Sequence, residues 1–240
     1  MLIPAPFKIL LLSAAFCFVA LCCYSQKTEL RANAYSGLFS FRSSGAASAA
    51  NISIVGPADG PGLFTAYPYG KKSGFSYAFE LQAQRVTAQR HLFGAGVGFE
   101  KLQSKVGFDS VSTQVGIKST KGNIRLTNEF VTFNPYIGHR FALKKILFDV
   151  TAGADIAFST KVYSKAKINF EKESTFSNTY KKHPVDVRPR VQLNMYYKRM
   201  GLLAGYSIGT EDVYKNTGYD YLNKKAFANF LRLGISYRLN

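Results

Sequence analysis

Alternation of apolar and polar positions with a period of two is the dominant pattern along this chain. In the stretch VDVRPRVQLNMYYKR, residues 185–199, Val191 and Leu193 share one parity, and Arg190 and Gln192 share the other. Successive side chains of a β-strand point to opposite faces of a sheet, so a period of two predicts a strand. The sequence therefore predicts an all-β fold whose strands have one apolar and one polar face.

Seven further stretches show the same pattern. Four alternate without a break, over 74–84, 93–100, 146–158 and 230–239, and three are less regular, over 29–42, 129–141 and 201–209. Together with 185–199 they give eight predicted strands. Pro135 falls inside one of them and has no backbone N–H to donate, so a bulge or a strand start is expected there.

The connections between these stretches alternate in length. Short polar links occur at 87–90, 143–145 and 198–201, and long links rich in Gly, Ser, Asn and Lys occur at 43–72, 104–127, 159–184 and 210–225. Short turns at one end and long loops at the other are typical of outer-membrane barrels. The pattern predicts an eight-stranded antiparallel up-and-down transmembrane β-barrel with its long loops outside the cell.

The first residues are predicted to be removed from the mature protein. Lys8, an apolar run over 9–21 and Ser25 before Gln26 form a secretory signal peptide over 1–25, which leaves 26–240 as the barrel domain. An uncleaved membrane helix is the alternative, but the run is shorter than the ~20 apolar residues that a span needs. All three cysteines fall in this leader: Cys17, Cys22 and Cys23. The mature chain is therefore expected to contain no disulfide and no cysteine metal ligand.

The composition of the two faces favours a membrane over water outside the barrel. A soluble β-sandwich or lipocalin-like barrel usually has an outer face rich in Lys and Glu, whereas the polar parity here carries Gly, Ser, Gln, Asn and isolated charges of both signs. These small and polar residues are typical of side chains that face a narrow lumen. Aromatic residues near strand ends are expected to form the girdles at the lipid–water boundaries: Phe141, Tyr196, Tyr197 and Tyr237.

The net positive charge of the chain predicts anionic partners. The full chain carries a formal charge of +17. For an exported protein the anionic partners are outer-membrane lipid and lipopolysaccharide, and no nucleic-acid partner is expected.

Three features resemble the PorT-type outer-membrane β-barrel proteins of Bacteroidota. They are the leader ending in Ser-Gln, the segment EFVTFNPYIGHRF at 129–141, and the alternating FLRLGISYRLN at the end of the chain. Members of that family usually close their last strand on an aromatic residue, whereas Asn240 follows Leu239 here. The resemblance implies eight strands, location in the cell outer membrane of a Gram-negative bacterium, and insertion by the barrel-assembly machinery. Some similar proteins serve type IX secretion and others serve adhesion.

The polar parity places charges of both signs inside the predicted barrel. The candidate lumen network comprises Glu80, Glu100, Asp149, Asp155, Asp186, Arg140, Arg188, Arg190, Arg232 and Arg238. An eight-stranded barrel is just wide enough for side chains to fill, and unpaired charges there cost several kcal/mol. A paired network that plugs the lumen is therefore expected. The alternative is a narrow anion-selective channel lined by the arginines.

A second candidate site lies in the link 159–184, where basic and aromatic residues are interleaved. The candidate loop surface comprises Lys161, Lys165, Lys167, Lys181, Lys182, Tyr163 and Tyr180. These lysines are suited to lipopolysaccharide phosphates or an acidic ligand, and the rings to stacking on sugar or peptide. The alternative is a solvated face that has no ligand.

No catalytic, cofactor or metal site is predicted. The chain has three histidines, and only His183, near Asp186 and Ser177, is expected at the outer end. The sequence contains no HExxH and no phosphate-cradling GxxxxGK motif. We predict a non-enzymatic barrel with a structural, surface-recognition or secretion-support role and a possible secretion-system or surface-ligand partner. The alternatives are the anion channel and a soluble secreted ligand-binding β-barrel.

Overall fold

The computed structural model describes residues 27–55, 62–65, 68–113, 116–169, 173–182, 185–215 and 224–240. The predicted signal peptide over 1–25 and His183 lie outside the described residues. The regular elements within the described ranges are eleven β-strands, which confirms the all-β prediction. In this part of the chain no helix has the length and apolar character needed to cross a membrane.

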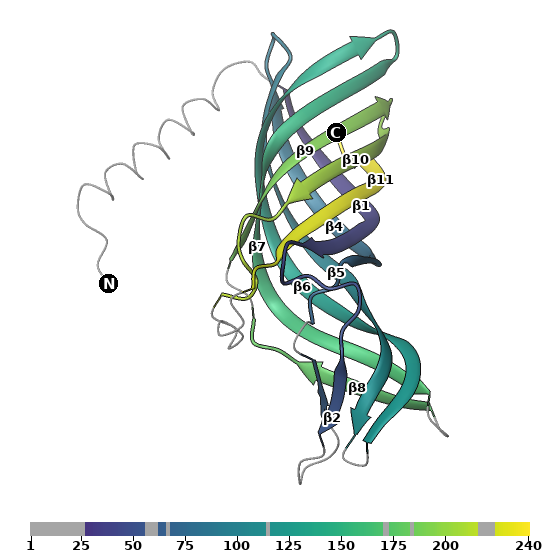
Figure 1. Cartoon of the computed structure of the whole chain (residues 1–240). Helices are drawn as coiled ribbons and strands as arrows, with labels where there is room; N and C mark the ends of the chain where they lie inside the picture. Colours follow the sequence, from purple (N-terminus) through teal and green to yellow (C-terminus); the bar gives the residue numbers. More distant parts are fainter. Residues whose placement is uncertain are drawn as a thin grey trace, which may run out of the picture.

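Eight of the strands pair in a closed ring, and Figure 1 shows the barrel that they form. They are β1 (Lys27–Arg42), β4 (Lys72–Val86), β5 (His91–Thr113), β6 (Gly116–Leu143), β7 (Ile146–Asn169), β9 (Asp186–Tyr197), β10 (Met200–Ile208) and β11 (Phe227–Arg238). Each pairs antiparallel with its neighbours, and β11 pairs back to β1. The predicted eight-stranded up-and-down barrel is confirmed. Closure gives the backbone of every barrel strand a partner on both sides.

The end of the chain extends the seam between β11 and β1. The Leu239 backbone N–H donates to the Leu30 carbonyl oxygen at 2.8 Å. The Asn240 side chain then accepts from the Leu30 N–H at 2.8 Å and donates to the Thr28 carbonyl at 3.1 Å. An amide has both a donor and an acceptor, so Asn240 takes the place of one further strand residue at the seam.

A belt of exposed apolar side chains surrounds the barrel. It includes Leu38, Phe79, Leu81, Val97, Phe133, Ile137, Val191, Leu193, Leu202, Leu233 and Ile235. All of these residues except Leu38 belong to the apolar parity predicted from the sequence. In the less regular stretch 29–42 the expected apolar parity of Tyr35, Phe39 and Phe41 is wrong, because these rings are buried inside and Leu38 faces outward. A continuous apolar surface that surrounds a closed barrel is stable against lipid acyl chains, because apolar patches of this extent are rare in water. The barrel therefore spans a membrane.

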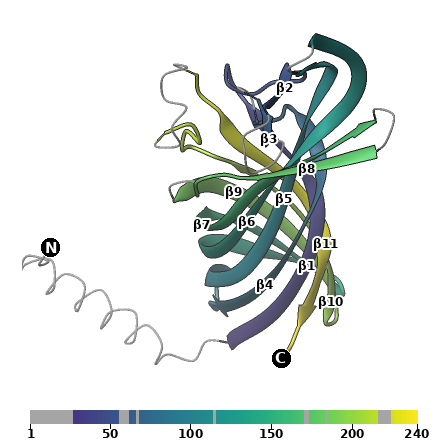
Figure 2. The same cartoon turned by 90° about the horizontal axis from the view of Figure 1, so that it is seen from below.

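Three barrel strands continue well beyond the belt. Figure 1 shows β5, β6 and β7 running past the barrel to the end of the molecule where β2 (Ile52–Val55) and β8 (Glu173–Thr179) lie, away from the C-terminus. β8 pairs with β7, and β2 pairs with both β5 and β3 (Gly62–Phe64). Figure 2 shows the same arrangement after a turn of 90°. We call this projecting sheet the extension.

The extension corrects the prediction of long loops at 104–127 and 159–184, which are mostly strand. Their period-two pattern continues but its polarity inverts. On β5 the outward side chain changes from Phe99 to Lys101, and the inward one changes from Glu100 to Leu102. Apolar side chains face lipid outside the barrel, whereas they turn inward where water is outside. The inward residues of the extension form a core of their own: Ile52, Phe108, Val111, Ile124, Ala166 and Ile168.

The prediction of a bulge or strand start at Pro135 is wrong. The β6–β7 register is the same for Phe133↔Ile156 and Tyr136↔Gly153, and the register shift lies instead between Glu129 and Phe130. Asn134 explains why the register holds. Its side-chain amide donates to the Ala154 carbonyl at 3.0 Å, which supplies a donor beside a proline that has no N–H.

The predicted girdles also need one correction. Phe141, Tyr197 and Tyr237 are exposed at the ends of their strands, as expected, whereas Tyr196 is buried in the barrel interior. The Tyr196 hydroxyl lies 2.7 Å from Ser236 Oγ, and the Arg31 guanidinium lies over its ring. Tyr196 follows the inward parity of β9 and belongs to the packing of the lumen.

Candidate functional site

Two groups of charged side chains fill the barrel interior, and the first lies toward the end with the short turns. This turn-end cluster comprises Glu29, Arg31, Arg140, Asp149 and Arg238. Arg140 is its centre: it donates to the two Glu29 oxygens at 2.8 and 2.7 Å and to the two Asp149 oxygens at 2.7 and 2.9 Å. Arg31 also binds both carboxylates. Each carboxylate therefore has at least two guanidinium partners.

The second group, the central cluster, lies further along the barrel. It comprises Glu80, Glu100, Asp155, Asp186, Arg188, Arg190 and Arg232. Asp155 forms ion pairs with Arg190 at 3.0 Å and with Arg232 at 2.7 Å, and so links these two arginines. Arg188 binds Glu100 at 2.5 Å. Glycines on β5 make room for these large groups, since a Cβ at Gly96 would lie 2.5 Å from Glu80 Oε1.

The described interior network is balanced, with six carboxylates and six arginines across the two clusters. All ten residues of the predicted lumen network lie in it. Glu29 and Arg31 were not predicted as members, although they alternate with Leu30 and Ala32 on β1. Because the interior is neutral, the positive excess of the chain lies elsewhere.

Aromatic side chains close the opposite mouth of the barrel. Segments 43–51, 68–71 and 210–215 are joined by hydrogen bonds at this end. Phe41 packs edge to face on Tyr69, and Tyr69 packs edge to face on Tyr214, with ring centroids 5.0 and 4.7 Å apart. The Tyr214 hydroxyl donates to the Gly45 carbonyl at 2.9 Å. The interior is thus filled by an aromatic layer above two charged layers.

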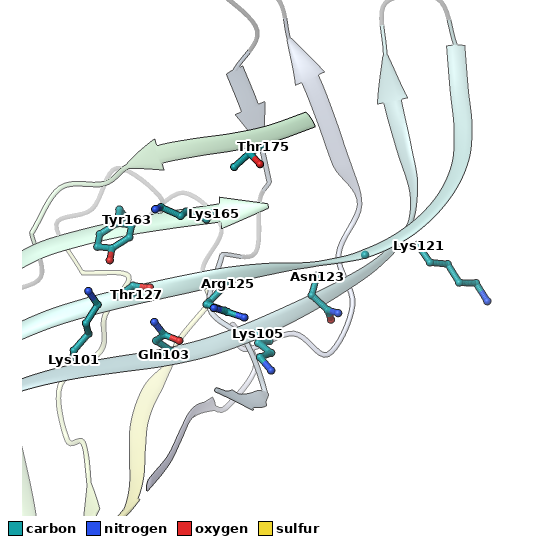
Figure 3. Close-up of a pocket in the computed structure, with 11 residues that line it drawn as sticks. Lys101, Gln103, Lys105, Lys121, Asn123, Arg125, Thr127, Tyr163, Lys165 and Thr175 are labelled. Atoms are coloured by element: carbon teal, nitrogen blue, oxygen red, sulfur yellow. The ribbon is translucent and has the colours of Figure 1, made fainter. Parts of the chain in front are cut away.

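The outer face of the extension carries a basic surface directly beyond the apolar belt. We call it the basic face and define it by Lys101, Lys105, Lys121, Arg125, Lys161 and Lys165. Five of these side chains, together with Gln103, Thr127, Tyr163 and others, line a shallow groove of ≈ 560 Å³ across β5, β6 and β7 (Figure 3). Glu129 lies beside this groove and pairs with Lys101 at 3.1 Å.

Tyr163 is the aromatic centre of the basic face. The Nζ atoms of Lys161, Lys101 and Lys165 lie 5.2, 5.8 and 5.8 Å from its ring centroid. A hydrogen bond to Tyr163 and the ion pair with Glu129 raise the pKa of Lys101 above its usual range. Lys101 is therefore a fixed positive charge at every physiological pH.

The candidate loop surface is only partly brought together. Lys161, Tyr163 and Lys165 share the outer face of β7 and line or border the groove. Lys167 also lies on β7, opposite Thr175 of β8. Tyr180 is half-buried with its hydroxyl 3.1 Å from Ser164 Oγ, and exposed Lys181 and Lys182 follow it outside the groove.

Sequence reasoning missed Lys101, Lys105 and Arg125, which line the same groove as Tyr163. Their signal is present, because Lys101, Gln103 and Lys105 alternate with buried Leu102 and Ser104. The strand partners of β7 contribute these cations, so the cluster becomes visible only once the sheet register is known.

Among the described residues, no group of three or more His, Cys, Asp or Glu side chains is placed to hold a metal ion. His91 and His139 lie side by side with their Nδ1 atoms 3.5 Å apart, near the short turns. The predicted absence of an enzyme site stays a prediction.

The described architecture combines short turns at one end, a projecting sheet at the other and a lipid-facing belt between them. Closed barrels of this design are the membrane-spanning form of the bacterial outer membrane. The chain is an outer-membrane-type β-barrel.

Comparisons with known proteins add similar structures but no family. No protein-family model matches the chain, and a search of curated proteins gives no match. Among solved structures it is similar to Ail, the attachment invasion locus protein of Yersinia pestis, in complex with the heparin analogue sucrose octasulfate. The two chains are 12% identical over 90% of this chain and 100% of that chain, and the TM-score is 0.35. It is also similar to Neisserial surface protein A, at 10% identity over 88% and 98% of the two chains, with a TM-score of 0.36. The resemblance to PorT-type barrels stays a prediction.

Proposed function

We propose that this protein is a non-enzymatic surface-recognition barrel of the outer membrane. Its closed, charge-balanced barrel serves as a rigid membrane anchor, and its extension presents the basic face outside the cell. The observation that carries the proposal is the continuation of β5, β6 and β7 beyond the belt, with an apolar core inside and cations outside.

The filled interior supports a scaffold rather than an anion channel. Each of Arg188, Arg190 and Arg232 forms ion pairs with carboxylates, so their charge is compensated within the protein. The aromatic layer of Phe41, Tyr69 and Tyr214 lies across the mouth above them. The exposed belt supports a membrane protein over a soluble ligand-binding barrel.

Cysteine labelling on intact cells tests the exposed position of the extension. We expect a membrane-impermeant maleimide to label Ser119→Cys, near the tip of the β5–β6 hairpin, without disruption of the cells. Lys145→Cys, in the short β6–β7 turn, should react only after the outer membrane is opened. The unsubstituted chain is the control, since its three cysteines all lie in the predicted leader.

The opposite labelling pattern would place the extension in the periplasm and overturn the proposed function. Labelling of both positions in intact cells would also contradict it, because the two ends of the barrel must then lie on the same side of the membrane.

A further inference from the structure

Three cations share one cross-strand row of the basic face. Lys105 lies opposite Arg125 in the β5–β6 register, and Arg125 lies opposite Lys165 in the β6–β7 register. Side chains directly opposite each other on a sheet have Cβ atoms about 5 Å apart, and like charges there repel. We call these three residues the cationic row. Such a row weakens the sheet unless an anion binds it.

The described contacts leave the cationic row uncompensated. Among the described residues no carboxylate forms an ion pair with Lys105, Arg125 or Lys165. The row nearer the belt differs, because Glu129 lies opposite both Lys101 and Lys161 there. The excess charge of the groove is therefore concentrated on its outer side.

The distance of each row from the belt narrows the class of ligand. Phe99 is the last exposed apolar residue on β5, and Lys101 and Lys105 follow it by two and six residues. At about 3.3 Å per residue and a strand tilt of about 45°, they lie about 5 and 14 Å beyond the hydrocarbon. Lipid headgroups occupy only about 5–7 Å on each side of the bilayer. A phospholipid phosphate thus reaches the level of Lys101 but not that of the cationic row.

Neutral polar groups lie between the two charged rows. Gln103 lies opposite Thr127, and Thr127 lies opposite Tyr163. The Gln103 amide and the Tyr163 hydroxyl belong to groups that donate to and accept from sugar hydroxyls, whereas the Thr127 side chain is buried. The groove therefore presents cations on both sides of a polar and aromatic strip (Figure 3).

We propose that the cationic row binds phosphate or carboxylate groups on the saccharide of an outer-leaflet glycolipid of the lipopolysaccharide class. The acyl chains of that lipid lie against the belt, its first sugars lie over Gln103 and Tyr163, and the anions of its core saccharide lie between Lys105, Arg125 and Lys165. The inference rests on the proposed function, which places the extension on the outer side of the membrane.

Binding of a fluorescent rough lipopolysaccharide to the mature barrel in zwitterionic micelles tests this site. We expect the variant Lys105→Gln/Arg125→Gln/Lys165→Gln to bind roughly a hundredfold more weakly, since each basic side chain near an anionic lipid surface contributes about a factor of five. The matched control is Lys144→Gln/Lys198→Gln/Arg199→Gln. It removes the same charges from exposed positions at the short turns and should change the Kd by less than about twofold.

Two further ligands show which part of the lipopolysaccharide the barrel recognises. Lipid A without core saccharide should bind the unsubstituted barrel about as weakly as core-bearing lipopolysaccharide binds the triple variant. Equal affinity of the unsubstituted barrel for both lipids would overturn the proposal. Soluble core oligosaccharide binding as tightly as the intact lipid would also overturn it, because the ligand would then be a free saccharide.

Folding of the triple variant is checked by its heat-dependent gel mobility and circular dichroism. Removal of three mutually repelling charges should leave thermal stability in the absence of lipid unchanged or raised. A destabilised triple variant would contradict the idea that the row is uncompensated. The micelle experiment does not depend on membrane orientation, so its failure is distinct from a failure of the labelling experiment.

Discussion

Replacement of Arg140 by glutamine is expected to lower the free energy of unfolding by about 3–5 kcal/mol, the range for breaking a buried ion pair by removing one partner. Arg140 donates four hydrogen bonds to Glu29 and Asp149. Without it, the two carboxylates depend on Arg31 and on Arg238, whose nearest nitrogen is 3.6 Å from Glu29. Equilibrium urea unfolding of the refolded barrel in micelles measures the loss.

Two controls separate lost pairing from the mere loss of a charge. Lys198→Gln removes an exposed cation at the same end of the barrel and should change stability by less than about 1 kcal/mol. The double variant Glu29→Gln/Arg140→Gln should lose less than the sum of the two single losses, because the residues are in contact. An Arg140→Gln barrel as stable as the Lys198→Gln barrel would contradict a paired interior.

Replacement of Leu233 by arginine is expected to cost about 2–4 kcal/mol, the penalty for a cation at the bilayer midplane. Leu233 is exposed in the middle of β11, between Leu231 and Ile235 on the lipid-facing parity. Leu239→Arg is the matched control, because Leu239 shares that parity at the end of the chain. There the same change should cost only about 0–1 kcal/mol.

Reversible unfolding from lipid vesicles gives both free energies on one scale. Equal costs at the two positions would show that depth in the membrane does not matter, and would contradict the belt. A cost at Leu239 larger than that at Leu233 would require a different position of the barrel in the bilayer.

The membrane part of the fold could be predicted from the sequence because lipid imposes a uniform apolar face. On β11, Leu231, Leu233 and Ile235 face the lipid. They alternate with Arg232 and Gly234, which face the tight lumen. The short turns also predicted the up-and-down topology. Strand order then follows, since each short turn joins neighbouring antiparallel strands.

The extension could not be predicted in the same way because its faces are inverted. Lys, Ser and Asn on the outer face of 104–127 and 159–184 resemble the composition of loops. The apolar residues in these stretches occupy the alternate positions, which face inward. A sheet in water and a sheet in lipid have opposite polarity, and the change from Phe99 to Lys101 marks the transition between them. That single step is the sequence signal for the membrane boundary.

The candidate sites were predictable to different degrees. Arg190 and Arg232 were recognised as interior residues because strong apolar residues flank them on β9 and β11. Glu29 and Arg31 were missed because their outward neighbours on β1 include Ala32, which gives little hydrophobic contrast. The cationic row depends on the register of three strands, and no pattern within one strand contains it.

Depth-dependent quenching by brominated lipids tests the central claim that the belt lies in the membrane and the basic face lies just outside it. The chain contains no tryptophan, so Phe79→Trp and Tyr163→Trp each give a single reporter. We predict that bromines at the bilayer centre quench the Phe79→Trp barrel strongly. The Tyr163→Trp reporter lies about 9 Å beyond the hydrocarbon, so it should be quenched only weakly, and only by lipids brominated nearest the headgroup. Strong quenching of Tyr163→Trp from the bilayer centre, or water-like emission from Phe79→Trp, would contradict the account.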